Sequence, residues 1–328
     1  MALSRRPTDP LIYVVSPNLT LDHVCMVDKL DATSGVYRAR EELLAPGGKG
    51  VNVSRALSLL NVESIVFGVS AGRVGGLVEE LAAEEGLQLH TTRVAGESRI
   101  VPIVVSGEPR RSLVINPPGP LLQSIEWANF VAEVEQRILA DKPVAVVCTG
   151  SLPRGVPADG YNAILNASRR AGAITVVDAA GGVLRAALAA RPDCAKVNLR
   201  EAREALAATE TGDSQMTELA AAAALRAHGA DIGIVTTGSG GAAAITTSTA
   251  FVASAPAVRV ASATGAGDAF LGGYVAAAAA GSSLRDAVID ATATATASVL
   301  TFEPARFDPA RRAALRGSVT ISDAPSRV

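Results

Sequence analysis

Residues 263–273 read Ala-Thr-Gly-Ala-Gly-Asp-Ala-Phe-Leu-Gly-Gly, a small-residue turn that leads directly into an apolar segment suited to a helix. Gly265 and Gly267 allow the backbone to turn tightly and to approach a ligand closely. Free N–H groups at such a helix start, with the positive end of the dipole behind them, suit an anion such as phosphate. Asp268 also fits an ordinary helix start, but a carboxylate beside a phosphate cradle is what a kinase needs to accept a hydroxyl proton.

Outward from this turn, short apolar runs alternate with longer segments of helical pattern. The expected strands are Leu11–Val15, Ile65–Val69, Val144–Cys148, Ile174–Asp178 and Ile232–Thr236. Near-continuous apolar strands between helices predict an α/β fold, a doubly wound and mainly parallel sheet with helices on both faces. In such folds ligands bind beyond the carboxyl ends of the strands.

Three further regions concern secondary structure. Trp127, Phe130, Val131, Val134 and Ile138 recur at helical spacing and predict a helix with one buried face. Residues 291–297 alternate Ala and Thr, which is a strand-like period, but the Ala content and the Ala-rich surroundings favour a helix. The tail from about Gly317 is polar, and we expect it to be frayed.

Composition excludes several classes of protein. The chain has 328 residues, of which 48% are hydrophobic and 19% charged, so a large core can form and wholesale disorder is excluded. A net charge of -2 and 3% aromatic residues argue against nucleic acid as a partner. Apolar stretches are interrupted by Gly, Ser, Thr and Pro, so we expect no membrane span. Three scattered cysteines fit buried thiols in a reducing cytoplasm.

Two segments interrupt the alternation of strands and helices. Residues 22–45 and 98–116 are more polar and contain strand-like stretches without helices between them. They predict either a small second sheet that projects from the core or two ordinary surface hairpins.

Two Gly-rich stretches resemble binding loops. Residues 46–56, Pro-Gly-Gly-Lys-Gly-Val-Asn-Val-Ser-Arg-Ala, open a helix, and Lys49 and Asn52 add groups that can bind sugar hydroxyls or phosphate. The segment is neither a Walker A loop nor a GxGxxG motif. The alternative interpretation is a flexible turn before a helix. Residues 148–157 follow a buried strand and carry Ser151 among small and rigid residues that suit a pocket floor, although an ordinary connection also explains them.

Two later stretches also carry polar groups. Asn198 and Glu201 stand three residues apart at an expected helix start, where they could hold a water-coordinated Mg²⁺ or form a capping box. Residues 236–241, Thr-Thr-Gly-Ser-Gly-Gly, follow a strand and fit either close approach of a nucleotide or a plain turn.

In this order, the GGKGxN, NxxE and GAGD segments resemble those of the ribokinase-like (PfkB) carbohydrate kinase family, over about residues 12–302. The phosphosugar branch is the most similar, through Ser16–Asp22, Ser98-Arg99, residues 115–120 and residues 150–157. The resemblance implies a ribokinase-like core formed by residues 1–21, 46–97 and 117–328. It also implies a small β-sheet lid formed by residues 22–45 and 98–116, which in relatives often pairs with a second subunit and so suggests a homodimer.

The resemblance also implies roles for particular residues. Asp268 matches the catalytic base, and Gly265, Ala266 and Gly267 match the anion-binding amides. The residues that match the substrate site are Asp22, Gly48, Lys49, Gly50, Asn52, Ser151 and, for the existing phosphate, Arg99 and Arg111. The residues that match the ATP site are Lys196, Asn198, Thr236, Gly238 and Gly241, with Asn198 and Glu201 serving Mg²⁺ through water.

The implied activity is ATP-dependent phosphorylation of a primary hydroxyl of a sugar phosphate. Fructose 1-phosphate is the acceptor that the resemblance favours. Tagatose 6-phosphate, fructose 6-phosphate, and a sugar or nucleoside without phosphate are the alternatives on the same fold. A sugar-phosphate sensor without catalysis is an alternative of a different class. A nicotinamide-dependent dehydrogenase is disfavoured because no GxGxxG follows the first strand.

Overall fold

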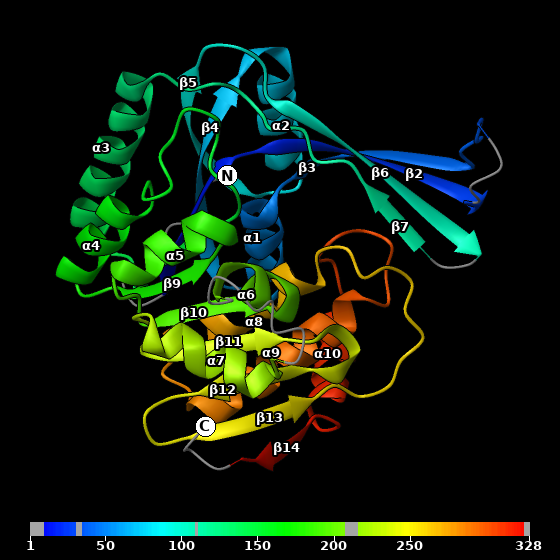
Figure 1. Cartoon of the computed structure of the whole chain (residues 1–328). Coiled ribbons are helices and arrows are strands. Elements are labelled where there is room, and N and C mark those ends of the chain that lie inside the picture. Colours follow the sequence, from blue (N-terminus) through cyan, green and yellow to red (C-terminus); the bar gives the residue numbers. More distant parts are fainter. Residues whose placement is uncertain (1–9, 31–34, 109–110, 207–215, 325–328) are drawn as a thin grey trace.

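The computed structural model describes residues 10–30, 35–108, 111–206 and 216–324, and a ten-stranded sheet lies at the centre of this part of the chain (Figure 1). From one edge to the other the strands are β14 Thr320–Asp323, β13 Ala250–Ser254, β12 Ala242–Ile245, β11 Ile232–Thr236, β10 Cys194–Asn198, β9 Ile174–Asp178, β8 Ala145–Thr149, β1 Leu11–Asn18, β4 Glu63–Ala71 and β5 Gln88–Val94. The seven strands from β11 to β5 run parallel, and β12, β13 and β14 pair antiparallel. The predicted mainly parallel sheet is confirmed.

Helices cover both faces of this sheet. One face is covered by α1 Lys49–Leu59, α2 Gly72–Glu84, α8 Ala266–Ala279 and α9 Leu284–Ser298, with α10 Pro309–Arg316 packed against α9. The other face is covered by α3 Ser124–Asp141, α4 Asn162–Arg170, α5 Gly181–Ala189, α6 Leu199–Leu206 and α7 Glu218–Ala227. The short 3₁₀ turn η1 Gly238–Gly240 follows β11.

Strand β1 shows how the sequence fills both faces. Ile12 and Val14 belong to the apolar cluster beneath α1 and α8, whereas Tyr13 and Val15 belong to the cluster beneath α3 and α4. Successive side chains of a strand point to opposite faces, so a strand buried on both faces is apolar throughout. This is why the expected strands were recognisable as continuous apolar runs.

A second, four-stranded sheet projects from the core in the order β3-β2-β6-β7 (Figure 1). Its strands are β2 Thr20–Lys29, β3 Glu41–Gly47, β6 Arg99–Glu108 and β7 Arg111–Val114. These strands come from the two irregular segments, so the prediction of a small sheet is confirmed against that of two separate hairpins. We call it the small sheet.

The structure agrees with the expected helices and corrects the expected tail. Helix α9 contains the Ala-Thr alternation. Helix α3 buries Trp127, Phe130, Val134 and Ile138, and Val131 is partly buried beside them. The expectation of a frayed tail from Gly317 was wrong for residues 320–323, because β14 pairs with β13 and closes one edge of the large sheet. Across the described residues, every helix is too short or too polar to cross a membrane.

Helices α1 and α8 approach each other closely, and this approach places the two Gly-rich turns side by side. A Cβ atom on Gly272 of α8 would lie 2.8 Å from the Cβ of Ala56 and 3.1 Å from the carbonyl oxygen of Val53 in α1. Only glycine at this position lets the two helices pack at their present distance.

We therefore expect Gly272→Val to lower the free energy of unfolding by about 1–3 kcal/mol, because the added atoms force α1 and α8 apart. Gly76→Val in α2 is the matched control, since an added Cβ there meets nothing within 4 Å. We expect the control to stay within about 0.5 kcal/mol of the wild type. Denaturant unfolding of the two variants checks this, and equal losses would contradict the packing argument.

Candidate active site

Polar side chains gather where the parallel strands end. Asn18 ends β1, Thr149 ends β8 and Asp178 ends β9, while Asn198 and Thr236 end β10 and β11. Thr149 is paired in register with Asp178, and Asn198 with Thr236, so these ends form one continuous edge. The site therefore lies at the carboxyl edge of the sheet, as expected for this fold class.

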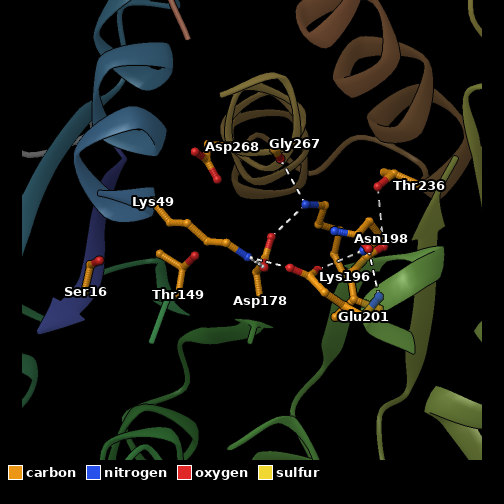
Figure 2. Close-up of polar contacts among 12 residues, drawn as sticks. Ser16, Lys49, Thr149, Asp178, Lys196, Asn198, Glu201, Thr236, Gly267 and Asp268 are labelled. Atoms are coloured by element: carbon orange, nitrogen blue, oxygen red, sulfur yellow. Dashed lines mark hydrogen bonds and ion pairs between the residues drawn. The ribbon is translucent and has the colours of Figure 1, made fainter. Parts of the chain in front are cut away.

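The Asp178 carboxylate is fully buried between two ammonium groups (Figure 2). Lys49 Nζ donates to Asp178 Oδ1 at 2.6 Å, and Lys196 Nζ donates to Oδ2 at 2.6 Å. Lys49 also lies 3.4 Å from Glu201 Oε1. Three segments far apart in the sequence thus meet at one carboxylate.

The charges around Asp178 and Lys49 determine whether these two side chains are ionised. Burial works to raise the pKa of Asp178, but the Lys196 and Lys49 ammonium groups outweigh it and hold the pKa below its usual value. Burial works to lower the pKa of Lys49, and the Asp178 and Glu201 carboxylates overcome that effect and raise it. Asp178 and Lys49 are therefore both charged at neutral pH.

Asp268 lies in the first turn of α8, which begins after Gly265 in the left-handed conformation with φ of 76°. Its side chain is buried, and its Oδ2 accepts a hydrogen bond from Asn52 Nδ2 at 2.9 Å. Burial raises the pKa of Asp268 to about 6, an effect that the Asp178 charge reinforces and that Lys49, Asn52 and Lys196 oppose. A carboxylate with this pKa is mostly ionised at neutral pH and is well matched to accept a proton.

The amides of the GAGD turn differ in their availability. Ala266 N donates to Ala263 O at 3.3 Å, and Asp268 N donates to Gly265 O at 3.1 Å. Among the described residues, the Gly267 amide has no backbone acceptor, while its carbonyl accepts from Lys196 Nζ at 3.0 Å. Gly267 thus offers a free donor at the helix start and holds a lysine beside it.

A buried arginine orients Asn52 toward Asp268. Arg55 Nη1 donates to Asn52 Oδ1 at 2.7 Å, so the amide nitrogen of Asn52 is the atom that faces the carboxylate. Arg55 in turn binds Glu85 with Nε and Nη2, at 2.7 Å and 3.1 Å. The bidentate contact with Glu85 fixes the position of the Arg55 guanidinium, and the guanidinium in turn fixes the orientation of the Asn52 amide.

A cleft of about 620 Å³ opens between the strand ends and the small sheet. The predicted residues that line it are Asp22, Gly48, Lys49, Asn52, Arg99, Ser151 and Glu201. Asp268 does not line the cleft directly, but its partner Asn52 does, so the carboxylate lies one hydrogen bond behind the cleft surface.

Asp22 and Arg99 stand on neighbouring strands of the small sheet. Asp22 Oδ1 accepts from Thr20 Oγ1 at 2.7 Å, and burial raises the pKa of Asp22. Arg99 donates to the carbonyls of Pro117 and Asn18, at 3.2 Å and 3.1 Å, and burial lowers its pKa. In the described part of the chain the Arg99 Nε–H has no partner, so this cation retains a donor for a ligand.

Other predicted residues have structural partners. Gly50 N donates to Ser16 Oγ at 3.2 Å, and a Cβ there would lie 2.2 Å from Ser16 Cβ. Asn198 and Glu201 form a reciprocal capping box. Glu201 N donates to Asn198 Oδ1 at 2.8 Å, and Asn198 N donates to Glu201 Oε2 at 3.2 Å. The capping interpretation is thus confirmed, and Glu201 Oε1 still faces Lys49.

The remaining predicted residues lie outside the cleft lining. Thr236 stands beside Asn198 at the sheet edge, and Gly238 and Gly241 follow it with φ of 65° and 96°. Packing requires glycine at position 241, since a Cβ there would lie 1.9 Å from the carbonyl oxygen of Ala253. Arg111 begins β7, and its side chain falls outside the described part of the structure.

The sequence analysis missed Asp178 and Arg55 as site residues. Asp178 was visible as an acid that ends an apolar strand, at the edge where ligands of this fold class bind. Arg55 stands three residues after Asn52 on the same helix face, a spacing at which side chains interact. Their partners, however, come from other elements.

The comparisons with known proteins agree with this geometry. The pfkB family carbohydrate kinase model matches residues 13–311. A 1-phosphofructokinase of Rhodobacter capsulatus is 32% identical, covering 96% of this chain and 98% of the relative. A 1-phosphofructokinase of Bacillus subtilis is 28% identical, and the match covers 81% of this chain and 85% of the relative. The crystal structure of phosphofructokinase-2 from Escherichia coli with potassium superposes with a TM-score of 0.82 at 23% identity, covering 94% and 99%.

The E. coli structure establishes the fold, and the family match spans most of the chain, including both Gly-rich turns and the strand ends between them. The chain therefore belongs to the pfkB family of carbohydrate kinases, phosphotransferases that act on a sugar hydroxyl.

Proposed function

We propose that this kinase transfers the γ-phosphoryl group of ATP to the primary hydroxyl at C6 of fructose 1-phosphate. The observation that carries the proposal is the Asp268 carboxylate, held by Asn52 directly behind a cleft to which Arg99 contributes a half-buried cation. The R. capsulatus and B. subtilis relatives carry the name of this activity, which supports the choice of acceptor.

In this proposal Asp268 accepts the proton of the attacking hydroxyl. A pKa of about 6 keeps it ionised at neutral pH and still makes it a stronger base than an ordinary aspartate. Asn52 holds the carboxylate in one orientation, which would lower the cost of aligning the base with the acceptor hydroxyl when the small sheet closes.

Charge on the transferring phosphoryl group would be met by donors around the GAGD turn. Within the described ranges, Lys196 uses two of its three N–H donors, on Asp178 and on the Gly267 carbonyl, and the third is available. The free Gly267 amide lies at the positive end of α8. Fixed donors of this kind stabilise developing charge without reorganising during the reaction.

Mg²⁺ fits the oxygen donors at the start of α6. The side-chain oxygens of Asn198 and Glu201 already accept from backbone amides, so a water-mediated role suits them better than direct coordination. Bound there, Mg²⁺ would neutralise charge on the nucleotide phosphates. Thr236, Gly238 and Gly241 would then border the nucleotide at the neighbouring strand end.

The acceptor would lie between the small sheet and the core. Arg99, with Arg111 as a second candidate, would pair with the existing phosphate, and Asp22 and Ser151 would contact sugar hydroxyls. The small sheet would act as a lid that excludes water. Ile100 and Leu113 of the small sheet are exposed, which suggests that a second copy of the chain covers this sheet. We place the enzyme in the cytoplasm.

The acceptor is tested by comparing kcat/KM for fructose 1-phosphate, tagatose 6-phosphate, fructose 6-phosphate, ribose and adenosine, read as ADP release with Mg²⁺ present. We expect fructose 1-phosphate to give the highest value. Ribose and adenosine should fall at least about 100-fold lower, because they place no phosphate beside the half-buried Arg99, whose Nε–H has no partner among the described residues. A higher value for fructose 6-phosphate would reassign the acceptor, and ligand binding without ADP release would indicate a sensor.

The role of Asp268 is tested by Asp268→Asn, which keeps the size of the side chain and removes its basicity. We expect kcat to fall by about 10²–10⁴-fold, while ATP affinity stays within a few-fold of the wild type. Glu204→Gln on the outer surface of α6 is the control and should leave both unchanged. Turnover of Asp268→Asn close to that of the wild type would remove Asp268 from the mechanism.

The pH profile tests the same carboxylate independently. Only ionised Asp268 can accept a proton, so kcat/KM should fall as pH drops through about 6. Arg55→Met releases the Asn52 amide, which favours the ionised form of Asp268. We therefore expect the fall of kcat/KM on the acid side of the pH profile, its acid limb, to move to higher pH by about one unit.

Arg200→Met removes an exposed arginine of α6 and should leave the acid limb in place. If Arg55→Met does not fold, Glu85→Gln weakens the same guanidinium contact more gently and should move the limb in the same direction. An unshifted limb in folded variants of Arg55 or Glu85 would show that the arginine does not act through Asn52.

A further inference from the structure

Three metal-binding side chains converge on the small sheet, outside the cleft. His23 Nε2 lies 3.2 Å from Glu42 Oε2 and 3.6 Å from Cys25 Sγ. All three ligand atoms lie within 4.8 Å of one another. Cys25 is a free thiol, and no other described residue is bonded to these ligand atoms.

Strand pairing accounts for the convergence. His23 and Cys25 are two residues apart on β2 and therefore point to the same face of the small sheet. Glu42 on β3 is directly opposite Cys25 in the antiparallel register, so it shares that face. The three side chains are thus presented by two hydrogen-bonded strands and need no loop rearrangement to meet.

Two of the three ligand-atom separations match a tetrahedral zinc site, and the third, between Cys25 and Glu42, is within 4.8 Å. With ordinary Zn–S, Zn–N and Zn–O bond lengths, tetrahedral geometry puts sulfur and nitrogen ligands about 3.6 Å apart and nitrogen and oxygen ligands about 3.4 Å apart. The observed separations are 3.6 Å and 3.2 Å. Three protein ligands leave the fourth position open to water.

The donor set selects the metal. Imidazole and thiolate are ligands that Zn²⁺ accepts readily, whereas Mg²⁺ and Ca²⁺ prefer oxygen donors throughout. We propose that His23, Cys25 and Glu42 form a Zn²⁺ site on the small sheet, a role separate from phosphoryl transfer.

The site lies on the face that turns away from the cleft. Asp22 alternates with His23 along β2 and lines the cleft, so His23 points to the opposite face. A metal there joins the edge strand β3 to β2 without occupying the sugar or nucleotide sites. Its binding can therefore be measured without reference to kinase activity.

The test uses the full chain in excess Mg²⁺, which competes for oxygen-only sites. Zinc content after gel filtration should be one equivalent per chain. Loading with Co²⁺ in place of zinc should produce a thiolate-to-cobalt charge-transfer band. That band reports on Cys25, because Cys148 and Cys194 are fully buried.

Cys25→Ser should abolish the band, and Cys25→Ser, His23→Gln and Glu42→Gln should each weaken zinc binding at least about 100-fold. Glu41→Gln is the matched control, since Glu41 precedes Glu42 on β3 and points to the other face. Glu42→Gln alters only an exposed carboxylate, so it keeps the test valid if Cys25→Ser or His23→Gln misfolds. Failure of the wild type to bind zinc, a band that survives in Cys25→Ser, or equal affinities in Glu41→Gln and Glu42→Gln would overturn the proposal.

Discussion

The Asp178 carboxylate, buried between Lys49 and Lys196, is the interaction on which the site depends. Taking a carboxylate out of water is costly, and here two ammonium groups at 2.6 Å offset that cost. The contact also joins the first residue of α1, the middle of β10 and, through the Gly267 carbonyl, the start of α8. Removing this one side chain would leave two lysines without a shared anchor.

The balance of charge at the site explains the ionisation of Asp268. Three carboxylates, on Asp178, Glu201 and Asp268, face the two ammonium groups of Lys49 and Lys196. The lysines are already bonded to Asp178 and Glu201, so Asp268 has Asn52 as its hydrogen-bond partner and retains much of the effect of burial. A pKa of about 6 is the outcome, high enough for useful basicity and low enough for ionisation at neutral pH.

The sequence allowed prediction of features that depend on neighbouring residues. The GAGD turn, the loop around Lys49 and the apolar strands each carry a local pattern. Partners brought together by the packing of distant elements had no such pattern: Asp178 meets Lys49 across 129 residues, and Arg55 meets Glu85 across 30. The pairing of β14 with β13 was missed for the same reason, since a polar four-residue segment becomes a strand only beside its neighbour.

Strand β3 ends at Gly47, and α1 begins at Lys49, so a single residue separates the small sheet from the helix that carries Lys49 and Asn52. So short a connection cannot absorb much displacement. If the small sheet closes over a sugar, as proposed, its rotation would pull on the first turn of α1. In that proposal, capture of the acceptor would also align the charged groups behind the cleft, and an empty sugar pocket would leave ATP poorly aligned for wasteful hydrolysis.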